Sequence, residues 1–460
     1  MLRQTRTAFL ALGLIFHTSL SQCKQSTIVR DIAIIGGGAS GTFSAVRLRD
    51  EGKSVILIEK DNILGGHVNT YQDLATKQTV DYGVVIFHNQ QVVKDYFGRL
   101  NVSWTMEAPS FSASVPKYLD GKTGKQTNYT SPDPTAALLA YAQQLSKYVQ
   151  LELGFFLPDP VPGDLLLPFG QFLTKYPDIG NATYTIFTYG QGLGDFLHQP
   201  TLYVFKNFGL DILQDMSSGF LVTTSHNNYE IYDHAAEFLG PDVLLSSRVV
   251  STRQRDQDGI ELDVQTPSGS QTVKGRKLLV AIPQKVDNMR PLALDSREST
   301  LFSRFANTGY YTSLVNNTGL PPNFTSYSVG SDTPYNLPKL PGVYSVSATA
   351  IQGVFDVKYG SPKGLSDSEV QCAIVTYIKK LQANGFAGNV SRKPGFVRFD
   401  SHTPFELTVS PEQIANGFYR DLYALQGYRN TWYTGAAFHT QNSAMLWNFT
   451  DSYVLPGLLK

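Results

Sequence analysis

The sequence predicts an α/β fold in which a Rossmann-type domain, built from three separate stretches of the chain, is interwoven with an α+β domain. Three observations lead to this prediction. An apolar strand runs into a glycine-rich turn near the N-terminus, strand-rich segments follow in the middle of the chain, and a strand that ends in glycine lies near the C-terminus. With 460 residues, of which 42% are apolar and 17% charged, the chain can bury cores for two such domains.

Residues 1–21 have the layout of a secretory signal peptide. Arg3 and Arg6 precede an apolar run from Ala8 to Phe16, and small residues follow. The apolar run is shorter than the about 20 residues that span a bilayer, so we predict a cleaved segment and no stable membrane anchor. Asn-x-Ser/Thr sequons favour the same route, and we predict a secreted or lumenal, N-glycosylated protein. The sequons begin at Asn101, Asn128, Asn181, Asn316, Asn323, Asn389 and Asn448.

The next segment predicts a strand, a glycine turn and a helix that bind a dinucleotide. Apolar residues 32–35 lead into the run 36–41. Gly36 allows the tight turn, Gly38 lets the backbone approach a diphosphate, and Gly41 lets the helix pack on the sheet. Unpaired amides and the positive dipole end at the helix start favour an anion, which places Ala39 and Ser40 at the cofactor as well.

A second buried strand is predicted at residues 55–58, and it ends at Glu59. The Glu59 carboxylate can accept hydrogen bonds from ribose hydroxyls and would repel a 2′-phosphate, which argues against NADP. Lys60, which follows it, is also expected at the cofactor.

Residues 59–70 resemble the extended fingerprint of flavin amine oxidases and their relatives, in which the acidic residue is followed by a second glycine pair. Such a pair lets the backbone pass close to the diphosphate and the flavin ring. The resemblance implies FAD rather than NAD, with Gly66, His67 and Val68 beside the ring.

The middle of the chain predicts helices and then strands. Asp133-Pro134 opens a helix whose apolar face includes Leu138, Leu139, Tyr141, Ala142, Leu145, Tyr148 and Val149. Residues 157–170 are predicted as a loop. The aromatic residues of 187–208, among them Tyr203, Phe205 and Phe208, either cover a cofactor or pack a helical subdomain.

A returning unit is predicted over residues 229–283: a helix at 229–239, then strands at 243–245, 249–250, 260–264 and 277–283. It resembles the returning part of an FAD domain, which implies that Val250 contacts the adenine. Residues 300–360 predict antiparallel strands of the second domain. Helices are expected at 367–384 and from Pro411 to about Gln426.

The closing segment resembles the last FAD motif of amine-oxidase-like proteins, in which a strand ends at glycine and a helix begins under the flavin. The resemblance places Gly435 at the strand end and makes the Leu446 amide a donor near the flavin. Many relatives carry an acidic residue after that glycine, where this chain has Ala436.

Together these motifs resemble the flavin-containing amine oxidoreductase superfamily, and within it the secreted fungal oxidoreductases of the beta-cyclopiazonate dehydrogenase type. The resemblance implies an FAD-dependent dehydrogenase or oxidase that removes a hydride from a C–H or C–N bond of a small aromatic or apolar natural product, with oxidative cyclisation as one outcome and oxygen or another molecule as electron acceptor. Two alternatives stay open: flavin-dependent double-bond isomerisation without net redox, and a secreted binding protein that has lost turnover.

The resemblance also implies the domain boundaries. The FAD-binding domain comprises residues 26–95, 229–299 and 426–460, and the substrate domain comprises 96–228 and 300–425. No catalytic residue is assigned. For His67 three roles stay open: contact with the flavin or support of the loop, contact with the substrate, and covalent attachment to FAD. His402 and His439 are alternative acid/base candidates because imidazole titrates near neutrality.

Charge and cysteine content exclude some partners. The 38 basic and 38 acidic residues cancel, so neither nucleic acid nor an anionic membrane is an expected partner. The two cysteines, Cys23 and Cys372, allow a disulfide, but Cys372 equally suits a helix core. No Cys/His cluster indicates a metal site, and none is predicted.

Overall fold

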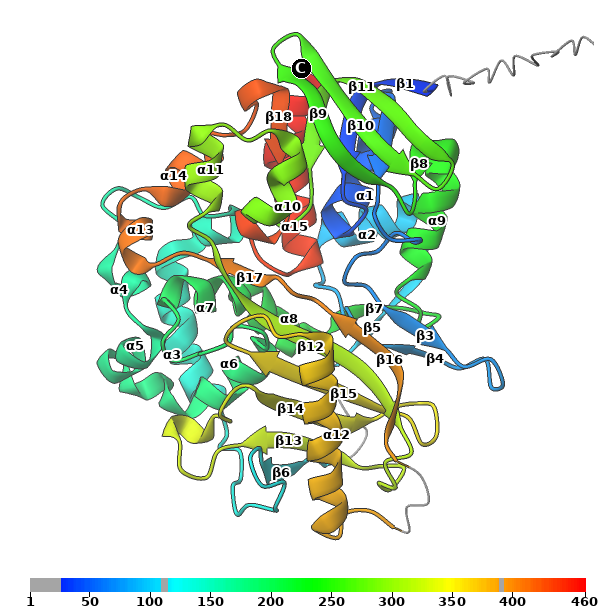
Figure 1. Ribbon diagram of the computed structural model, residues 1–460. Helices are drawn as coiled ribbons and strands as arrows, with labels where there is room; N and C mark the ends of the chain where they lie inside the picture. The colour runs from blue at the N-terminus through cyan, green and yellow to red at the C-terminus, as the bar shows by residue number, and fades with distance from the viewer. Residues whose placement is uncertain (1–25, 109–114, 389–392) are drawn as a thin grey trace, which may run out of the picture.

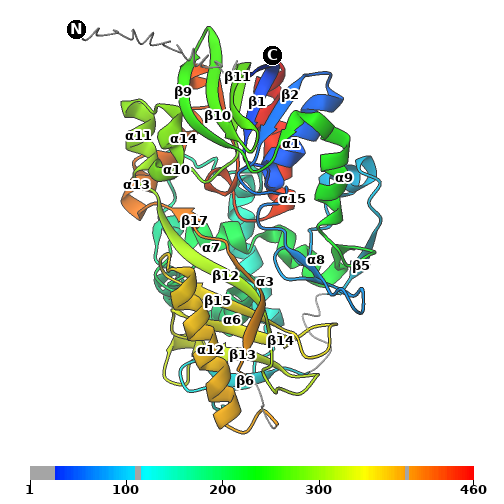
Figure 2. The same cartoon turned by 45° about the vertical axis from the view of Figure 1, so that its right-hand side comes forward.

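The protein has two lobes, each built around a seven-stranded sheet (Figure 1). The computed structural model describes residues 26–108, 115–388 and 393–460, so the predicted signal peptide lies outside it. The turned view also places one lobe above the other (Figure 2).

The sheet of the upper lobe has the strand order β8-β2-β1-β11-β10-β9, with β18 beside β11. The strands β8, β2, β1, β11 and β18 run parallel to their neighbours, whereas β9, β10 and β11 form an antiparallel meander. The apolar residues 32–35 and 55–58 are buried, as expected for strands covered on both faces. The α/β prediction is therefore confirmed. The strands are β1 (Ser26–Ile35), β2 (Val55–Ile58), β8 (Val243–Leu244), β9 (Arg248–Asp256), β10 (Gly259–Thr266), β11 (Gly269–Val280) and β18 (Thr431–Tyr433).

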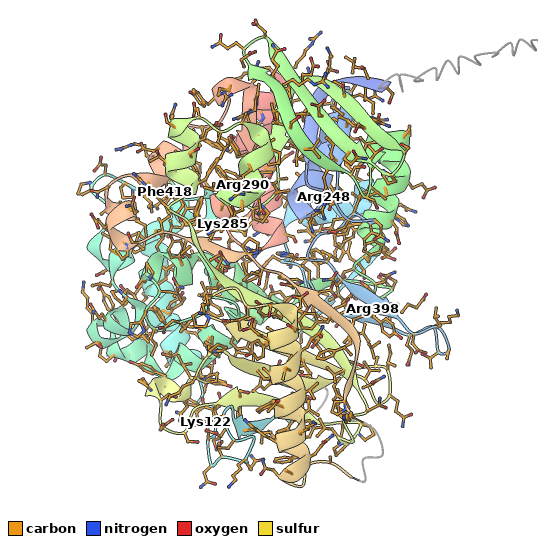
Figure 3. All side chains as sticks on the ribbon, in the orientation of Figure 1. Lys122, Arg248, Lys285, Arg290, Arg398 and Phe418 are labelled. Carbon is orange, nitrogen blue, oxygen red and sulfur yellow. The ribbon has the colours of Figure 1, made fainter. Side chains whose placement is uncertain are left out.

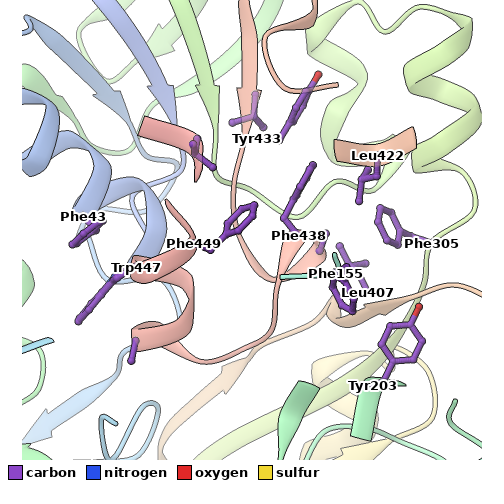
Figure 4. Close-up of a cluster of buried hydrophobic side chains, with 14 of the residues drawn as sticks. Phe43, Phe155, Tyr203, Phe305, Leu407, Leu422, Tyr433, Phe438, Trp447 and Phe449 are labelled. Carbon is purple, nitrogen blue, oxygen red and sulfur yellow. The ribbon is translucent and has the colours of Figure 1, made fainter. Parts of the chain in front are cut away.

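Helices from both ends of the chain pack together against this sheet. Trp447 stacks on Phe43 with ring centroids 5.6 Å apart, and its indole N–H donates to the Ala39 carbonyl at 3.1 Å (Figure 4). This contact fixes α15, the helix that carries Trp447, against the start of α1. The helices are α1 (Ala39–Asp50), α2 (Gln91–Arg99), α9 (Glu230–Leu239), α15 (Ser443–Phe449) and, after a π-helical segment at 450–454, α16 (Leu455–Leu459).

The lower sheet has the order β16-β12-β15-β14-β13-β6, with β17 also paired to β12. It is antiparallel except where β13 meets β6, and α12 (Asp367–Ala383) packs on it. A capping box of Ser366 and Glu369 begins α12. The strands are β6 (Lys117–Asp120), β12 (Ala306–Asn316), β13 (Thr325–Val329), β14 (Gly342–Ala348), β15 (Phe355–Ser361), β16 (Gly395–Ser401) and β17 (Phe405–Thr408).

Two small strand pairs lie between the lobes: β3 (Thr70–Gln72) with β4 (Thr79–Asp81), and β5 (Trp104–Glu107) with β7 (Phe220–Thr223). The guanidinium of Arg398 on β16 lies 4.8 Å from the ring of Tyr71 on β3, which connects this hairpin to the lower sheet (Figure 3).

A group of short helices fills the side of the molecule. Tyr203, Phe205 and Phe208 are buried among them, which agrees with packing of a helical subdomain. None of the helices in the described part of the chain has the length and apolar character of a membrane span. The helices are α3 (Thr135–Leu145), α4 (Gly163–Leu166), α5 (Phe169–Lys175), α6 (Thr183–Tyr189), α7 (Thr201–Asn207), α8 (Leu210–Ser218), α10 (Val286–Met289), α11 (Ser296–Phe302), α13 (Pro411–Ala415) and α14 (Phe418–Tyr423), with 3-10 segments η1 (Ser146–Leu153), η2 (Pro177–Ala182), η3 (Gly240–Asp242), η4 (Arg290–Leu292), η5 (Pro334–Asn336), η6 (Tyr428–Asn430) and η7 (Ala436–Phe438).

Three predicted elements were wrong in detail. The helix expected from Pro411 to Gln426 is two helices, because Gly417 has a φ of +82° that no α-helix accommodates. Leu139 on α3 is exposed, and so is Val149, which lies beyond the end of α3 in η1, so the apolar face of the predicted helix is narrower and shorter than expected. The segment 157–170 contains α4 and the first two residues of α5 rather than loop alone.

Candidate cofactor and substrate site

The first glycine loop has the backbone that the sequence predicts for a phosphate-binding turn. Gly36 has a φ of +102°, and its amide donates to the Ile58 carbonyl at 2.9 Å, which ties the turn to β2. A Cβ at Gly41 would overlap the Gly36 carbonyl oxygen. Only glycine lets α1 begin this close to the turn, with its uncapped first amides, including those of Ala39 and Ser40, at the loop.

Glu59 is buried at the end of β2 and holds the loop. One carboxylate oxygen accepts from the Gly37 amide at 2.6 Å and the other from the Asp61 amide at 2.8 Å. A carboxylate has about four acceptor positions, so two remain for a ribose diol. Lys60 instead lies on the surface, where its ammonium is 3.1 Å from the Asp61 carboxylate.

The second glycine loop touches the first. The Gly65 amide donates to the Gly37 carbonyl at 2.8 Å, and a Cβ on Gly66 would lie 2.9 Å from the Gly38 Cα. Val68 is buried behind this contact, and its amide donates to the Gly65 carbonyl at 3.1 Å. A Cβ at Gly38 would meet only the Gly66 Cα, at 3.7 Å, so both backbones stay open to a diphosphate.

The C-terminal segment contains the start of a helix, α15, as the resemblance implied. The Leu446 amide, which the resemblance made a donor to the flavin, is already hydrogen-bonded within the chain. Gly435 has a φ of +108°, and a side chain there would meet open space. The Leu446 amide already donates to the Asn442 carbonyl at 3.0 Å, one turn back. Because the first amides of a helix have no intrahelical acceptor, Ser443 and Ala444 are better placed as donors than Leu446.

The backbone of Glu59 is hydrogen-bonded to the end of β8 and to the loop between β8 and β9. The Glu59 amide donates to the Leu244 carbonyl at 2.9 Å, and the Ser247 amide donates to the Glu59 carbonyl at 2.8 Å. Val250 lies farther along β9 and its side chain is 55% exposed. Its contact with adenine stays a prediction, and Leu244 to Ser247 are nearer the Glu59 carboxylate.

The structure brings two of the candidate histidines together. The rings of His67 and His402 stack with centroids 4.2 Å apart and an interplanar angle of 9°. The ring centroid of Phe405 lies 5.9 Å from that of His67, and the ring centroid of Tyr310 lies 5.0 Å from that of Phe405. We call these four residues the aromatic wall. His67 comes from the upper lobe and the other three from β12, β17 and the segment before β17, so the wall lies where the lobes meet.

Both imidazoles of the wall are held neutral. Burial, with a contribution from the positive charge of Lys60, lowers the pKa of His67 to about 4. Burial lowers the pKa of His402 well below its usual value, and the charges of His67 and Lys358 act in the same direction. The wall therefore presents flat, uncharged surfaces at neutral pH.

His439, the third candidate, belongs to a separate buried polar cluster. Its ring lies 3.1 Å from the Lys206 ammonium, and its Nε2 donates to the Glu152 carbonyl at 3.0 Å. Burial lowers the pKa of Lys206 to about 7 and raises that of Glu406 to about 7. Glu406 follows Phe405 on β17, so this cluster lies directly behind the aromatic wall.

Sequence reasoning missed several residues of the site. Tyr310 and Phe405 carry no motif, and Asn69, whose amide nitrogen is 3.2 Å from His402 Nε2, was not singled out. Glu406 combines burial with a φ of +40°, which only the folded backbone reveals. The one usable signal was the mixture of polar and aromatic residues at 402–406.

We predict that Glu59→Ala lowers FAD affinity about 10- to 100-fold, because the ribose loses its acceptor and the Gly37 and Asp61 amides lose theirs. The dissociation constant of FAD, measured by fluorescence quenching of the free cofactor, checks this. Lys60→Ala is the neighbouring control, since its side chain faces solvent. Unchanged FAD retention in Glu59→Ala would contradict the ribose role.

Comparison with known proteins agrees with this geometry. Residues 34–100 match the model of the NAD(P)-binding Rossmann-like domain. FAD-dependent oxidoreductase oblC from Cochliobolus heterostrophus is 42% identical, over 95% of this chain and 92% of that protein. Beta-cyclopiazonate dehydrogenase from Aspergillus oryzae is 34% identical, over 96% of each chain.

Solved structures share the fold at low identity. A fatty acid isomerase from P. acnes, described as producing CLA, superposes with a TM-score of 0.74 at 18% identity, over 93% of this chain and 98% of that one. Wild-type putrescine oxidase bound to putrescine gives a TM-score of 0.65 at 16% identity, over 94% and 100%. The two glycine loops, Glu59 and the start of α15 fit the cofactor of these relatives, and the chain belongs to the fungal FAD-dependent oxidoreductase family that includes beta-cyclopiazonate dehydrogenase.

Proposed function

We propose that this oxidoreductase removes a hydride from a C–H or C–N bond of a small aromatic or apolar natural product. The aromatic wall is the observation that carries the proposal. Its imidazoles are neutral at pH 7, and burial raises the pKa of Tyr310, which keeps that phenol protonated. A flat apolar molecule can therefore stack there without desolvating a charge. FAD, when bound, supplies the hydride acceptor.

The residues of the chain then orient the substrate and exclude water. Phe405 and His402 are buried and hold one side of the site, while the Tyr310 hydroxyl is directed to Gln191 at 3.2 Å. A fixed aromatic surface restricts a planar substrate to few orientations. Holding the reacting bond in one orientation toward the hydride acceptor accelerates the transfer. An internal nucleophile of the substrate would close a ring at the oxidised carbon, and oxygen or another molecule would accept the electrons.

The name of one relative, beta-cyclopiazonate dehydrogenase, supports a natural-product substrate. The match to a fatty acid isomerase favours a second candidate, double-bond isomerisation without net redox. A catalytically inactive binding protein is the third reading.

One anaerobic experiment distinguishes these activities. The purified holoenzyme is mixed with beta-cyclopiazonate, a polyunsaturated fatty acid or, as a charged control, putrescine, and the visible absorbance of the flavin is recorded. Loss of that absorbance after one equivalent of product, restored by air, supports dehydrogenation. Many product equivalents without air and without lasting bleaching would indicate isomerisation. If no compound of the panel bleaches the flavin or is converted to product, that result opposes both activities.

We also propose that the protein is secreted and N-glycosylated. The sequon residues Asn101, Asn128, Asn181 and Asn323 are exposed, which supports it. Asn448 is a poor acceptor because it lies in α15 and its amide donates to Gln90. We expect protein from the culture medium to lose mass on deglycosylation, with the peptide of Asn448 unmodified. Unmodified exposed sequons and an intact residue 1–21 segment in secreted material would contradict this.

A further inference from the structure

His67 differs from the other histidines that the structure describes, because its ring nitrogens have no hydrogen-bond or ion-pair partner in the described part of the chain. His88 bonds Asp215, His198 bonds Asp195, His234 bonds the Leu100 carbonyl, His226 faces Glu107, His402 contacts Asn69, and His439 contacts Lys206. His67 is also half-buried. A half-buried imidazole with free nitrogens can bond a polar group from outside the chain.

The backbone fixes where those nitrogens lie. Gly66, which precedes His67, touches Gly38 of the phosphate loop. On the other side a Cβ at Gly83 would lie 2.6 Å from the Asn69 amide and overlap the His67 carbonyl, so the strand before Tyr82 packs closely on this turn. The imidazole is therefore held beside the cofactor loops, at the junction of the two lobes.

His402 covers one face of the His67 ring and leaves its edge free. The ring of His402 is fixed, since it is buried, its amide donates to the Tyr310 carbonyl at 2.9 Å and its Nε2 lies 3.2 Å from the Asn69 amide nitrogen. An amide nitrogen is a donor, so Nε2 of His402 is the acceptor and its ring is not available to a substrate proton there.

We propose, on the basis of the dehydrogenation proposed above, that His67 is the catalytic base and that His402 is the residue that positions it. As a substrate C–H bond breaks, both of its electrons would leave as hydride, and bound FAD would supply the two-electron oxidant. In the same step the adjacent atom loses its proton to a ring nitrogen of His67, and the electron pair of that bond forms the new double bond, so loss of the base slows flavin reduction itself. The proton passes from the imidazolium to solvent.

A weak base is suited to this step. The proton leaves an atom next to the positive charge that develops as the hydride departs, which makes this proton strongly acidic, so little basicity is needed. Two ammonium groups, of Lys60 and Lys358, oppose a positive charge at the pair, although the Asp356 carboxylate lies 3.0 Å from the Lys358 ammonium and offsets part of its charge. His67 then stays free to accept a proton across the neutral pH range, and the rate should fall only as the pH drops through the pKa of His67, about 4.

The test compares His67→Gln with a matched histidine variant, His198→Gln, whose ring is exposed and contacts only Asp195. Anaerobic flavin reduction by the substrate that bleaches the wild type is measured by stopped flow. We expect flavin reduction in FAD-loaded His67→Gln at saturating substrate to be slowed about 100- to 10,000-fold, and His198→Gln to equal the wild type. His402→Phe, which keeps a stacked ring, should retain far more of the rate than His402→Ala.

A second readout needs no turnover. The visible spectrum of the bound flavin should change as the pH falls through about 4 in wild type and His198→Gln, and this change should be absent in His67→Gln. A normal reduction rate in His67→Gln, or the same spectral change in it, would overturn the proposal while leaving the dehydrogenation intact. A wild type that no compound of the panel reduces would overturn both.

Discussion

Gly41→Ala is expected to lose FAD almost completely. The new methyl group would overlap the Gly36 carbonyl oxygen and lie 3.0 Å from the Gly36 carbonyl carbon and 3.2 Å from the Ala281 side chain. The first two of these atoms belong to the backbone of the turn, so relief requires α1 to move away from the loop that we expect to bind the diphosphate. Such overpacking costs about 3 kcal/mol or more, equivalent to roughly 100-fold in the dissociation constant of FAD.

The matched control is Gly98→Ala, which places the same methyl group in helix α2, where it meets nothing within 4 Å. It should bind FAD as the wild type does and be as stable or slightly more so. The ratio of flavin to protein absorbance after gel filtration, followed by FAD titration of the apoprotein, measures the effect. If Gly41→Ala kept its flavin through gel filtration, the close approach of α1 to the turn would not be needed for binding.

The sequence predicted those parts of the site that depend on neighbours in the chain. The glycine turn, the helix after it and Glu59 at the end of the next strand follow from local geometry, and each is where it was expected. The aromatic wall could not be predicted in this way. His67 and His402 meet only because β12 and β17 of the lower sheet reach the second glycine loop, and no spacing in the sequence encodes that contact.

The misplaced details have local causes. Leu446 matched the resemblance by position, but α15 begins at Ser443, so the Leu446 amide is already bonded within the helix. The apolar pattern of 411–426 continues through Gly417, whose left-handed backbone divides the helix without disturbing the pattern. In both cases the residue pattern was read correctly, and the backbone conformation of one or two residues decided the outcome.

Glu298→Ala is expected to destabilise the upper lobe by roughly 3–5 kcal/mol, because it leaves the Arg255 guanidinium buried without its partner. Arg255 donates to both carboxylate oxygens at 2.6 Å, the Tyr433 hydroxyl donates at 2.7 Å, and neither Arg255 nor Glu298 is exposed. These residues come from β9, α11 and β18, so the ion pair joins separate stretches of the chain around one edge of the sheet.

The pH dependence of this pair has a definite sign. Burial opposes the charged carboxylate, but the hydrogen bonds and charge of Arg255, with the Tyr433 hydroxyl, outweigh it and lower the pKa of Glu298. A carboxyl group whose pKa is lower in the folded state stabilises the protein above its unfolded pKa, and this stability is lost as the pH falls through the folded value. The wild type should therefore lose stability on acidification, and Glu298→Ala should lose less.

Urea unfolding of the apoprotein, followed by Trp fluorescence, gives the midpoint for each variant at neutral and acid pH. Asp287→Ala is the control, since it removes the exposed ion pair with Arg290 and should change stability by less than about 0.5 kcal/mol (Figure 3). Replacing both partners, as Arg255→Met with Glu298→Leu, should recover much of the loss because no charge is then left unpaired. If Glu298→Ala unfolded at the same urea concentration as Asp287→Ala, other contacts would have to hold β9, α11 and β18 together.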